Sequence, residues 1–121
     1  MMKLDSVPEV LIDSRRGRKF IVAIVSDKNK QNKIVVRANL RKRRHYNLFT
    51  DLKETLRPFD FAVQCIGGGH IMVNPEAKTI HIWGKSLEFN FEPNRQETAT
   101  LLQKAFPDFQ VILSEPTPQP T

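Results

Sequence analysis

A histidine stands where a basic run meets an amphipathic segment of the sequence. The run at residues 41–44 is Arg-Lys-Arg-Arg, and His45 follows it directly. Leucine and phenylalanine then recur at the i, i+3, i+4, i+7 spacing of one helical face, so a helix is predicted to begin close to His45. A helix N-terminus favours a bound phosphate and disfavours an imidazolium, which makes His45 a candidate catalyst. The apolar face consists of Leu48, Phe49, Leu52 and Leu56.

Position alone leaves plainer interpretations open. A histidine in a first helical turn is more often a solvated or capping residue than a catalytic one. Basic runs such as residues 41–44 are usually solvated loops or nonspecific anion patches. A role for His45 therefore needs a pocket around it, and the rest of the chain must supply that pocket.

The composition indicates one domain with an anionic partner. The chain has 121 residues, and we assign residues 1–113 to a single domain and residues 114–121, which contain three prolines, to a disordered tail. Residues 1–57 carry a net charge of +9 and residues 58–121 a net charge of −3. This polarity suggests a phosphoprotein, a nucleotide, a nucleic acid or an acidic lipid headgroup as the partner.

The cellular location is also constrained by the sequence. The first residues lack the apolar core of a signal peptide, and the longest apolar run, residues 20–25, is too short to span a bilayer. The single cysteine, Cys65, excludes an internal disulfide and agrees with a reducing compartment. We therefore expect a cytoplasmic protein that does not insert into a membrane, and we expect a monomer.

The alternation of apolar and polar residues, interrupted by glycine and proline, predicts an α+β fold. We expect a single-domain mixed β-sheet of about six strands with two α-helices. The β-branched run at residues 19–25 suggests a central strand with both faces covered. Alternating residues from Phe59 to Ile66 predict a strand with one face on the core, and the triple glycine at residues 67–69 is favoured as a turn after it. Further strands are expected at 9–13, 34–36, 70–73, 79–83 and 109–113, a loop at 85–88, and a second helix that starts at Pro93, ends before Pro107 and has Ala99, Leu102, Ala105 and Phe106 on its apolar face.

Several familiar chemistries lack their motifs. The triple glycine is followed by His70 and not by the Lys-Ser/Thr pair of a P-loop. Cys65 has isoleucine, Ile71, where a cysteine phosphatase loop would need arginine, and Ser86 is not in a Gly-x-Ser-x-Gly elbow. The three histidines are scattered along the chain, so we expect no metal site and no cofactor. His45 then remains as the candidate for acid–base or nucleophilic catalysis, and Lys19, Arg41 and backbone amides could hold an anion. This set of groups fits phosphoryl transfer.

Several stretches resemble the phosphohistidine phosphatase family, which also includes the insect Janus and ocnus proteins. They occur in the family's order and at nearly its spacing from about residue 8 to residue 113. The segments Cys-Ile-Gly-Gly-Gly and Ile-His-Ile-Trp-Gly are together quite specific. The matching stretches are residues 10–14, 19–20, 35–37 leading to 45, 64–69, 78–84 and 106–109.

The resemblance implies metal-independent hydrolysis of the P–N bond of phosphohistidine, and also of phospholysine, in proteins. His45 matches the family's catalytic histidine, which acts as a general base on water or attacks directly. Lys19 matches the lysine that contacts the phosphate, and the Tyr46 amide is expected to join it. Ser86, Leu87 and Glu88 match the short loop that surrounds the phosphate. Phosphohistidine-containing proteins are thus the expected partners.

Two residues depart from the family pattern. His70 stands where vertebrate enzymes carry arginine, which removes a fixed positive charge. Glu88 stands where a small residue is expected, and its carboxylate would repel a phosphate unless the side chain turns away, although Lys85 could compensate. These departures suggest a specialised Janus-type paralogue, linked by resemblance to sexual differentiation or the male germline, in which activity is weak, redirected or lost.

Three hypotheses of different classes follow. The leading one is a protein-histidine phosphatase with His45 as base and Lys19 and Ser86 in the anion clamp. The second is a catalytically silent module that binds phosphoproteins, motivated by His70 and Glu88. The third, binding of nucleic acid through residues 37–44, ranks last because no aromatic-rich RNA motif or DNA-reading signature accompanies the basic run.

Overall fold

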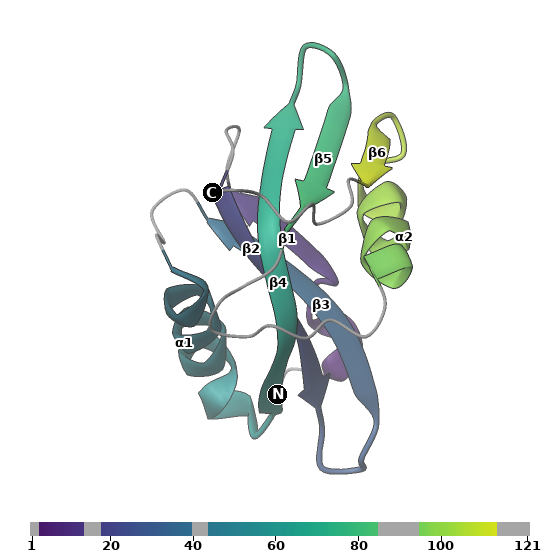
Figure 1. The fold of residues 1–121 in the computed structure, drawn as a ribbon. Coiled ribbons are helices and arrows are strands. Elements are labelled where there is room, and N and C mark those ends of the chain that lie inside the picture. The colour runs from purple at the N-terminus through teal and green to yellow at the C-terminus, as the bar shows by residue number, and fades with distance from the viewer. Residues whose placement is uncertain (1–2, 14–17, 40–43, 85–94, 114–121) are drawn as a thin grey trace.

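The computed structural model describes residues 3–13, 18–39, 44–84 and 95–113 (Figure 1). The elements are η1 (Leu4–Ser6), β1 (Val10–Asp13), β2 (Arg18–Ser26), β3 (Asn32–Asn39), α1 (His45–Leu56), η2 (Arg57–Phe59), β4 (Ala62–Asn74), β5 (Thr79–Trp83), α2 (Arg95–Ala105) and β6 (Gln110–Leu113).

The described strands form one mixed sheet in the order β1-β3-β2-β4-β5-β6. The two outer pairs, β1 with β3 and β5 with β6, are parallel. The inner pairs, β3 with β2, β2 with β4 and β4 with β5, are antiparallel. The α+β fold with a mixed sheet of six strands and two helices is thus confirmed.

Strand β2 occupies the interior of the sheet, as its β-branched sequence predicted. Alternate residues of β2 point to opposite faces, and both faces are buried. On one face Ile21, Ala23 and Val25 join the first hydrophobic cluster. On the other face Phe20 and Val22 join the second. The sheet therefore separates two cores.

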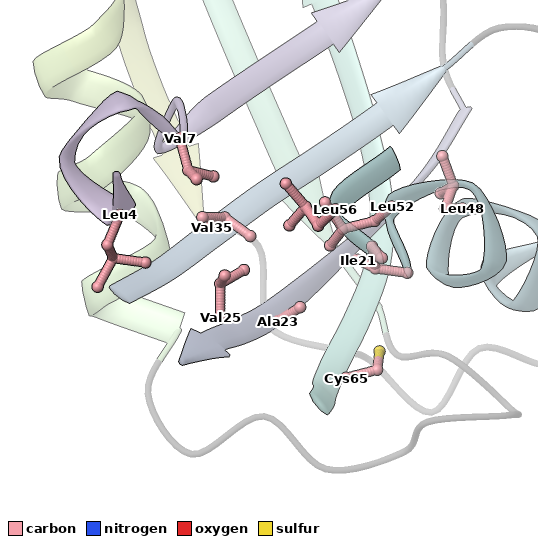
Figure 2. Close-up of a cluster of buried hydrophobic side chains, with 10 residues drawn as sticks. All are labelled: Leu4, Val7, Ile21, Ala23, Val25, Val35, Leu48, Leu52, Leu56 and Cys65. Carbon is pink, nitrogen blue, oxygen red and sulfur yellow. The ribbon is translucent and has the colours of Figure 1, made fainter. Parts of the chain in front are cut away.

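Helix α1 covers one face of the sheet and α2 covers the other. The apolar stripe of α1 packs on the first cluster, and Figure 2 shows its leucines beside Ile21, Ala23 and Cys65. Leu102 of α2 is completely buried in the second cluster. Figure 1 shows the two helices on opposite sides of the central strands. Leu48, Leu52 and Leu56 of the predicted apolar face are buried, and Phe49 packs partly buried against the same cluster. His45 is buried as well, which the spacing did not predict.

Strand β4 differs most from the sequence-based expectation. The triple glycine at residues 67–69 is not a turn; it lies inside one strand of 13 residues that pairs with β2 and β5. A β-bulge shifts the β2–β4 register between Val22 and Ala23. Val22 pairs with Gly67 and Ala23 pairs with Cys65, so Ile66 is the extra residue of the bulge. Ile66 is buried in the second cluster, whereas the sequence placed only one face of this strand on a core.

The start of β4 was also predicted too early. Phe59 belongs to η2, and Asp60 has a left-handed backbone with φ 60°, which separates Phe59 from the strand that begins at Ala62. Pro58 favours this short turn because its ring fixes φ. Cys65, Phe61 and Val63 nevertheless contribute to the first cluster, as the alternation predicted.

The C-terminal elements required smaller corrections. Ala105 is exposed and Phe106 lies just after α2, so the apolar face of this helix is shorter than predicted. Leu113 is 38% exposed, because β6 is an edge strand with one side open. Residues 14–17, the Pro93 start of the second helix, the loop at 85–88 and the tail at 114–121 lie outside the described residues.

Candidate anion site

His45 is the first residue of α1 and packs against the triple glycine of β4. The residue is only 3% exposed, and its Nε2 atom lies 2.9 Å from the carbonyl oxygen of Gly69. A carbonyl oxygen only accepts hydrogen bonds, so Nε2 carries the proton in this contact. The other ring nitrogen, Nδ1, then carries the lone pair that a general base needs.

The glycine at position 68 makes the approach of the imidazole possible. A Cβ atom on Gly68 would lie 2.8 Å from His45 Cδ2 and would also collide with the backbone oxygen of Phe20. Only a residue without a side chain fits between β2 and the ring. The Gly-Gly-Gly sequence thus provides close packing for His45 inside a strand, and not the turn between two strands that the sequence favoured.

The start of α1 places backbone N–H groups beside the histidine. The helix begins at His45, and the N–H groups of Asn47 and Leu48 both donate to the carbonyl oxygen of Arg44. The positive end of the helix dipole therefore lies at His45 and Tyr46. Tyr46 is 55% exposed, so this end of the helix is open to solvent on its outer side.

Lys19 and His70 lie on neighbouring strands close to His45. They are register partners across β2 and β4. The His70 ring lies 6.4 Å from the His45 ring in an edge-on arrangement. Burial and then the positive charge of Lys19 lower the pKa of His70 below its usual value, so its imidazole is neutral at pH 7. The structure therefore brings three of the basic residues singled out from the sequence, Lys19, His45 and His70, into one region.

Arg95 is a neighbour of this region that sequence reasoning missed. It starts α2, and its Nη2 atom donates to the carbonyl oxygens of Gly84 and Gly68 at 2.6 and 3.5 Å. Its guanidinium lies 5.4 Å from the centre of the Phe20 ring, a residue of the core on the α2 side. The sequence carries no local signal for this contact, because the two carbonyl groups come from other elements.

Other predicted site residues are not placed by the structure. Ser86, Leu87, Glu88 and Lys85 lie outside the described residues, and so does Arg41. Cys65 is buried in the first cluster, where its Sγ atom lies 3.5 Å from the Gly67 oxygen. The candidate site is therefore built from Lys19, His45 and His70, with the start of α1.

The described ranges contain neither a cluster of metal-binding side chains nor a membrane-spanning helix. In residues 3–13, 18–39, 44–84 and 95–113, no three His, Cys, Asp or Glu side chains gather in a way that could hold a metal ion. Among the helices of the described segments, none has the length and apolar character needed to cross a membrane.

Comparison with known proteins identifies the family. The model of the Janus/Ocnus family matches residues 4–110. The sex-regulated protein janus-A of Drosophila melanogaster is 28% identical over 112 residues, which cover 93% of this chain and 82% of the relative. Janus-A of Drosophila yakuba is 29% identical over the same shares of both chains, and janus-B of Drosophila sechellia is 28% identical over 95% of this chain and 83% of the relative. The chain belongs to the Janus/Ocnus family.

Proposed function

We propose that this member of the Janus/Ocnus family is a protein-histidine phosphatase that hydrolyses the P–N bond of phosphohistidine in proteins. Phospholysine is a second candidate substrate because it contains the same kind of bond. The observation that carries the proposal is the position of His45, a histidine fixed by a backbone carbonyl at the positive end of α1 and close to Lys19 and His70. The resemblance of the sequence to phosphohistidine phosphatases supports the choice of substrate.

The proposed reaction uses His45 as a general base. Nδ1 of His45 takes a proton from water, the water oxygen forms a bond to phosphorus, and the P–N bond breaks. The leaving nitrogen takes a proton from solvent and His45 returns its proton to solvent, so the base is restored and the products are the free side chain and inorganic phosphate. Direct attack by the imidazole remains the alternative, in which a phosphorylated His45 would form first.

The phosphoryl group would be held by the charge of Lys19 and by hydrogen bonds from Ser86 and backbone amides. An ammonium group and N–H groups stabilise the negative charge on the phosphoryl oxygens. By resemblance, Leu87 and Glu88 complete the loop beside Ser86. This proposal needs no metal ion, because Lys19 and the helix dipole supply positive charge. We also propose that the protein acts as a monomer in the cytoplasm.

The names of the relatives suggest a biological setting. The Drosophila proteins are named as sex-regulated. We therefore place the proposed activity in sexual differentiation, and the family resemblance of the sequence suggests the male germline as the tissue.

A matched pair of variants tests the catalytic role. We expect His45→Gln to lose turnover of a phosphohistidine peptide, since general-base catalysis contributes about 10²- to 10⁴-fold. Glutamine can still donate a hydrogen bond to the Gly69 oxygen, so packing is largely kept. His81→Gln, the same change at a half-buried position on β5, should retain activity. Assays with a chelator present should give the same rates, and turnover that survives in His45→Gln would refute the assignment.

Binding without catalysis is the second candidate function. The 3% exposure of His45 favours it, because a buried base cannot reach a substrate unless the surrounding structure opens. Saturable binding of a phosphohistidine peptide by folded protein, without release of phosphate, would establish this alternative. Glu88→Ala would then be the next variant to test for restored activity.

A further inference from the structure

His70 lies between Lys19 and Trp83 on the same face of the sheet as His45. Side chains two residues apart on a strand point to the same face of the sheet. A side chain at Gly68 would point toward His45. His70, two residues further on, therefore points to the same side, in agreement with the 6.4 Å between the two imidazoles. Lys19 is its partner on β2, and Trp83 is its partner on β5.

Two contacts fix the position of the His70 ring. It stacks on Trp83 with a centroid distance of 5.6 Å and an interplanar angle of 27°. The second contact is with Gly84. A Cβ atom at this position would lie 2.9 Å from His70 Cδ2, so only glycine fits there. Gly84 also has a φ of 74°, which favours glycine. The ring is thus held beside Lys19 by the strand pairing on both sides.

The neighbours of His70 that the structure describes are cationic or neutral. Lys19 faces it from β2, and His45 faces it from α1. On β5, His81 packs against the far neighbour Trp83 at 5.3 Å. On the α2 side, Arg95 donates to the oxygen of Gly84, the residue at which an added Cβ atom would meet the His70 ring. None of these four neighbours, all of them in the described part of the chain, is a carboxylate, so they would attract an anion or leave it unaffected.

We propose that His70 is a binding residue of the anion site, which takes up a proton when a phosphoryl group or another tetrahedral dianion binds beside Lys19. The proposal deepens the proposed function and rests on it for the natural ligand. An anion between the two side chains offsets the repulsion by Lys19 and forms a charge-assisted hydrogen bond with the imidazolium. The site then gains a positive charge only when it is occupied.

Linkage gives the direction of the pH dependence. The free protein has a neutral His70 at pH 7, since burial and Lys19 lower its pKa. The bound state carries an additional proton, so a fall in pH favours binding. A site with arginine at this position would lack such dependence, because guanidinium stays charged throughout this range.

Sulfate titrations provide the test, since the charge of sulfate does not change over this range. The fluorescence of Trp83, the single tryptophan of the chain, should report binding beside His70. We expect sulfate to bind several-fold more tightly at about pH 5.5 than at about pH 7.5, because binding is coupled to proton uptake by one group. Calorimetry in buffers of different ionisation enthalpy should show proton uptake on binding.

Three variants separate His70 from the other histidines. His70→Gln should bind sulfate weakly, with the same affinity at both pH values, and His70→Arg should bind tightly at both. The third variant, His81→Gln, should keep the pH dependence. Urea unfolding of each variant confirms that it is folded.

Three results would each overturn the proposal. They are pH-independent sulfate binding by the unmodified chain, pH dependence that persists in His70→Gln, and no sulfate binding at all. The experiment uses no phosphatase substrate, so a failure of the proposed catalysis is recognised separately by normal sulfate binding without turnover.

Discussion

At the scale of single residues, the site depends on very close contacts between side chains and backbone. His45 donates to a glycine oxygen on β4, and the missing side chain of Gly68 provides the space for its ring. His70 uses a second glycine, Gly84, in the same way. The chemistry of the region therefore depends on two glycines as much as on the histidines.

Gly68→Ala tests the first of these contacts. We expect the free energy of unfolding to fall by about 1–3 kcal/mol, because the added methyl group must displace the imidazole or the β2 backbone. Any activity that needs His45 should fall more than the stability alone explains. Urea denaturation measures the first effect. The matched control is Gln64→Ala, at an exposed position of the same strand, and an unchanged midpoint in Gly68→Ala would contradict the close packing.

The depressed pKa of His70 predicts a stability that depends on pH. The unfolded chain binds a proton at this residue near its ordinary pKa of 6.5, whereas the folded, anion-free protein does so only at lower pH. The contribution of neutral His70 is complete above pH 6.5 and is lost as the pH falls through the folded pKa. Urea unfolding at several pH values in chloride buffer should show this loss. His70→Gln should remove that part of the slope, and an identical slope in this variant would count against it.

At the scale of elements, α1 and α2 contact β4, the strand with the triple glycine, from opposite faces of the sheet. His45 at the start of α1 binds the Gly69 oxygen, and Arg95 at the start of α2 binds the Gly68 and Gly84 oxygens. Both helices thus begin at residues that contact β4. The strand between them is fixed at the point where the candidate site lies.

Arg95→Gln should loosen this arrangement. We expect a loss of about 1–3 kcal/mol in the free energy of unfolding, the usual scale for hydrogen bonds from a charged donor. Arg95→Lys keeps the charge but not the planar fork, so its stability should lie between those of the glutamine variant and the unmodified chain. Chemical denaturation of the three proteins measures the order. Equal stability of all three would show that the guanidinium contacts contribute little.

Sequence patterns predicted the elements well where one periodicity governs the segment. The leucine spacing predicted the start of α1 at His45, and the β-branched run predicted β2 in the interior. The triple glycine was misread because glycine is typical of turns, whereas here it permits close approach inside a strand. Only the pairing of β4 with β2 and the position of α1 reveal that difference, and both are long-range contacts.

In the candidate site, too, sequence patterns select individual residues but do not predict the contacts between distant segments. The sequence selected His45 and Lys19, and the structure places them near each other through the β2–β4 pairing and the contact between His45 and β4. Arg95 was not predicted, because its partners are backbone oxygens of Gly68 and Gly84, which no residue pattern encodes. The stacking of His70 on Trp83 likewise depends on the β4–β5 register.

At the scale of the whole molecule, one sheet with a helix on each face supports a site at the start of α1. The two hydrophobic clusters lie on opposite sides of the sheet and make β2 and β4 a rigid base. The N-terminal half of the chain carries the net positive charge and supplies Lys19 and His45. These features suit the attraction and positioning of a phosphorylated partner.

The most direct measurement is the rate at which a phosphohistidine peptide loses its phosphate, followed by ³¹P NMR with the unmodified protein and with His45→Gln. The account predicts hydrolysis well above the rate in buffer, and a fall of about 10²- to 10⁴-fold when His45 is replaced. Equal rates for the two folded proteins would contradict the assignment of His45 as the catalytic base.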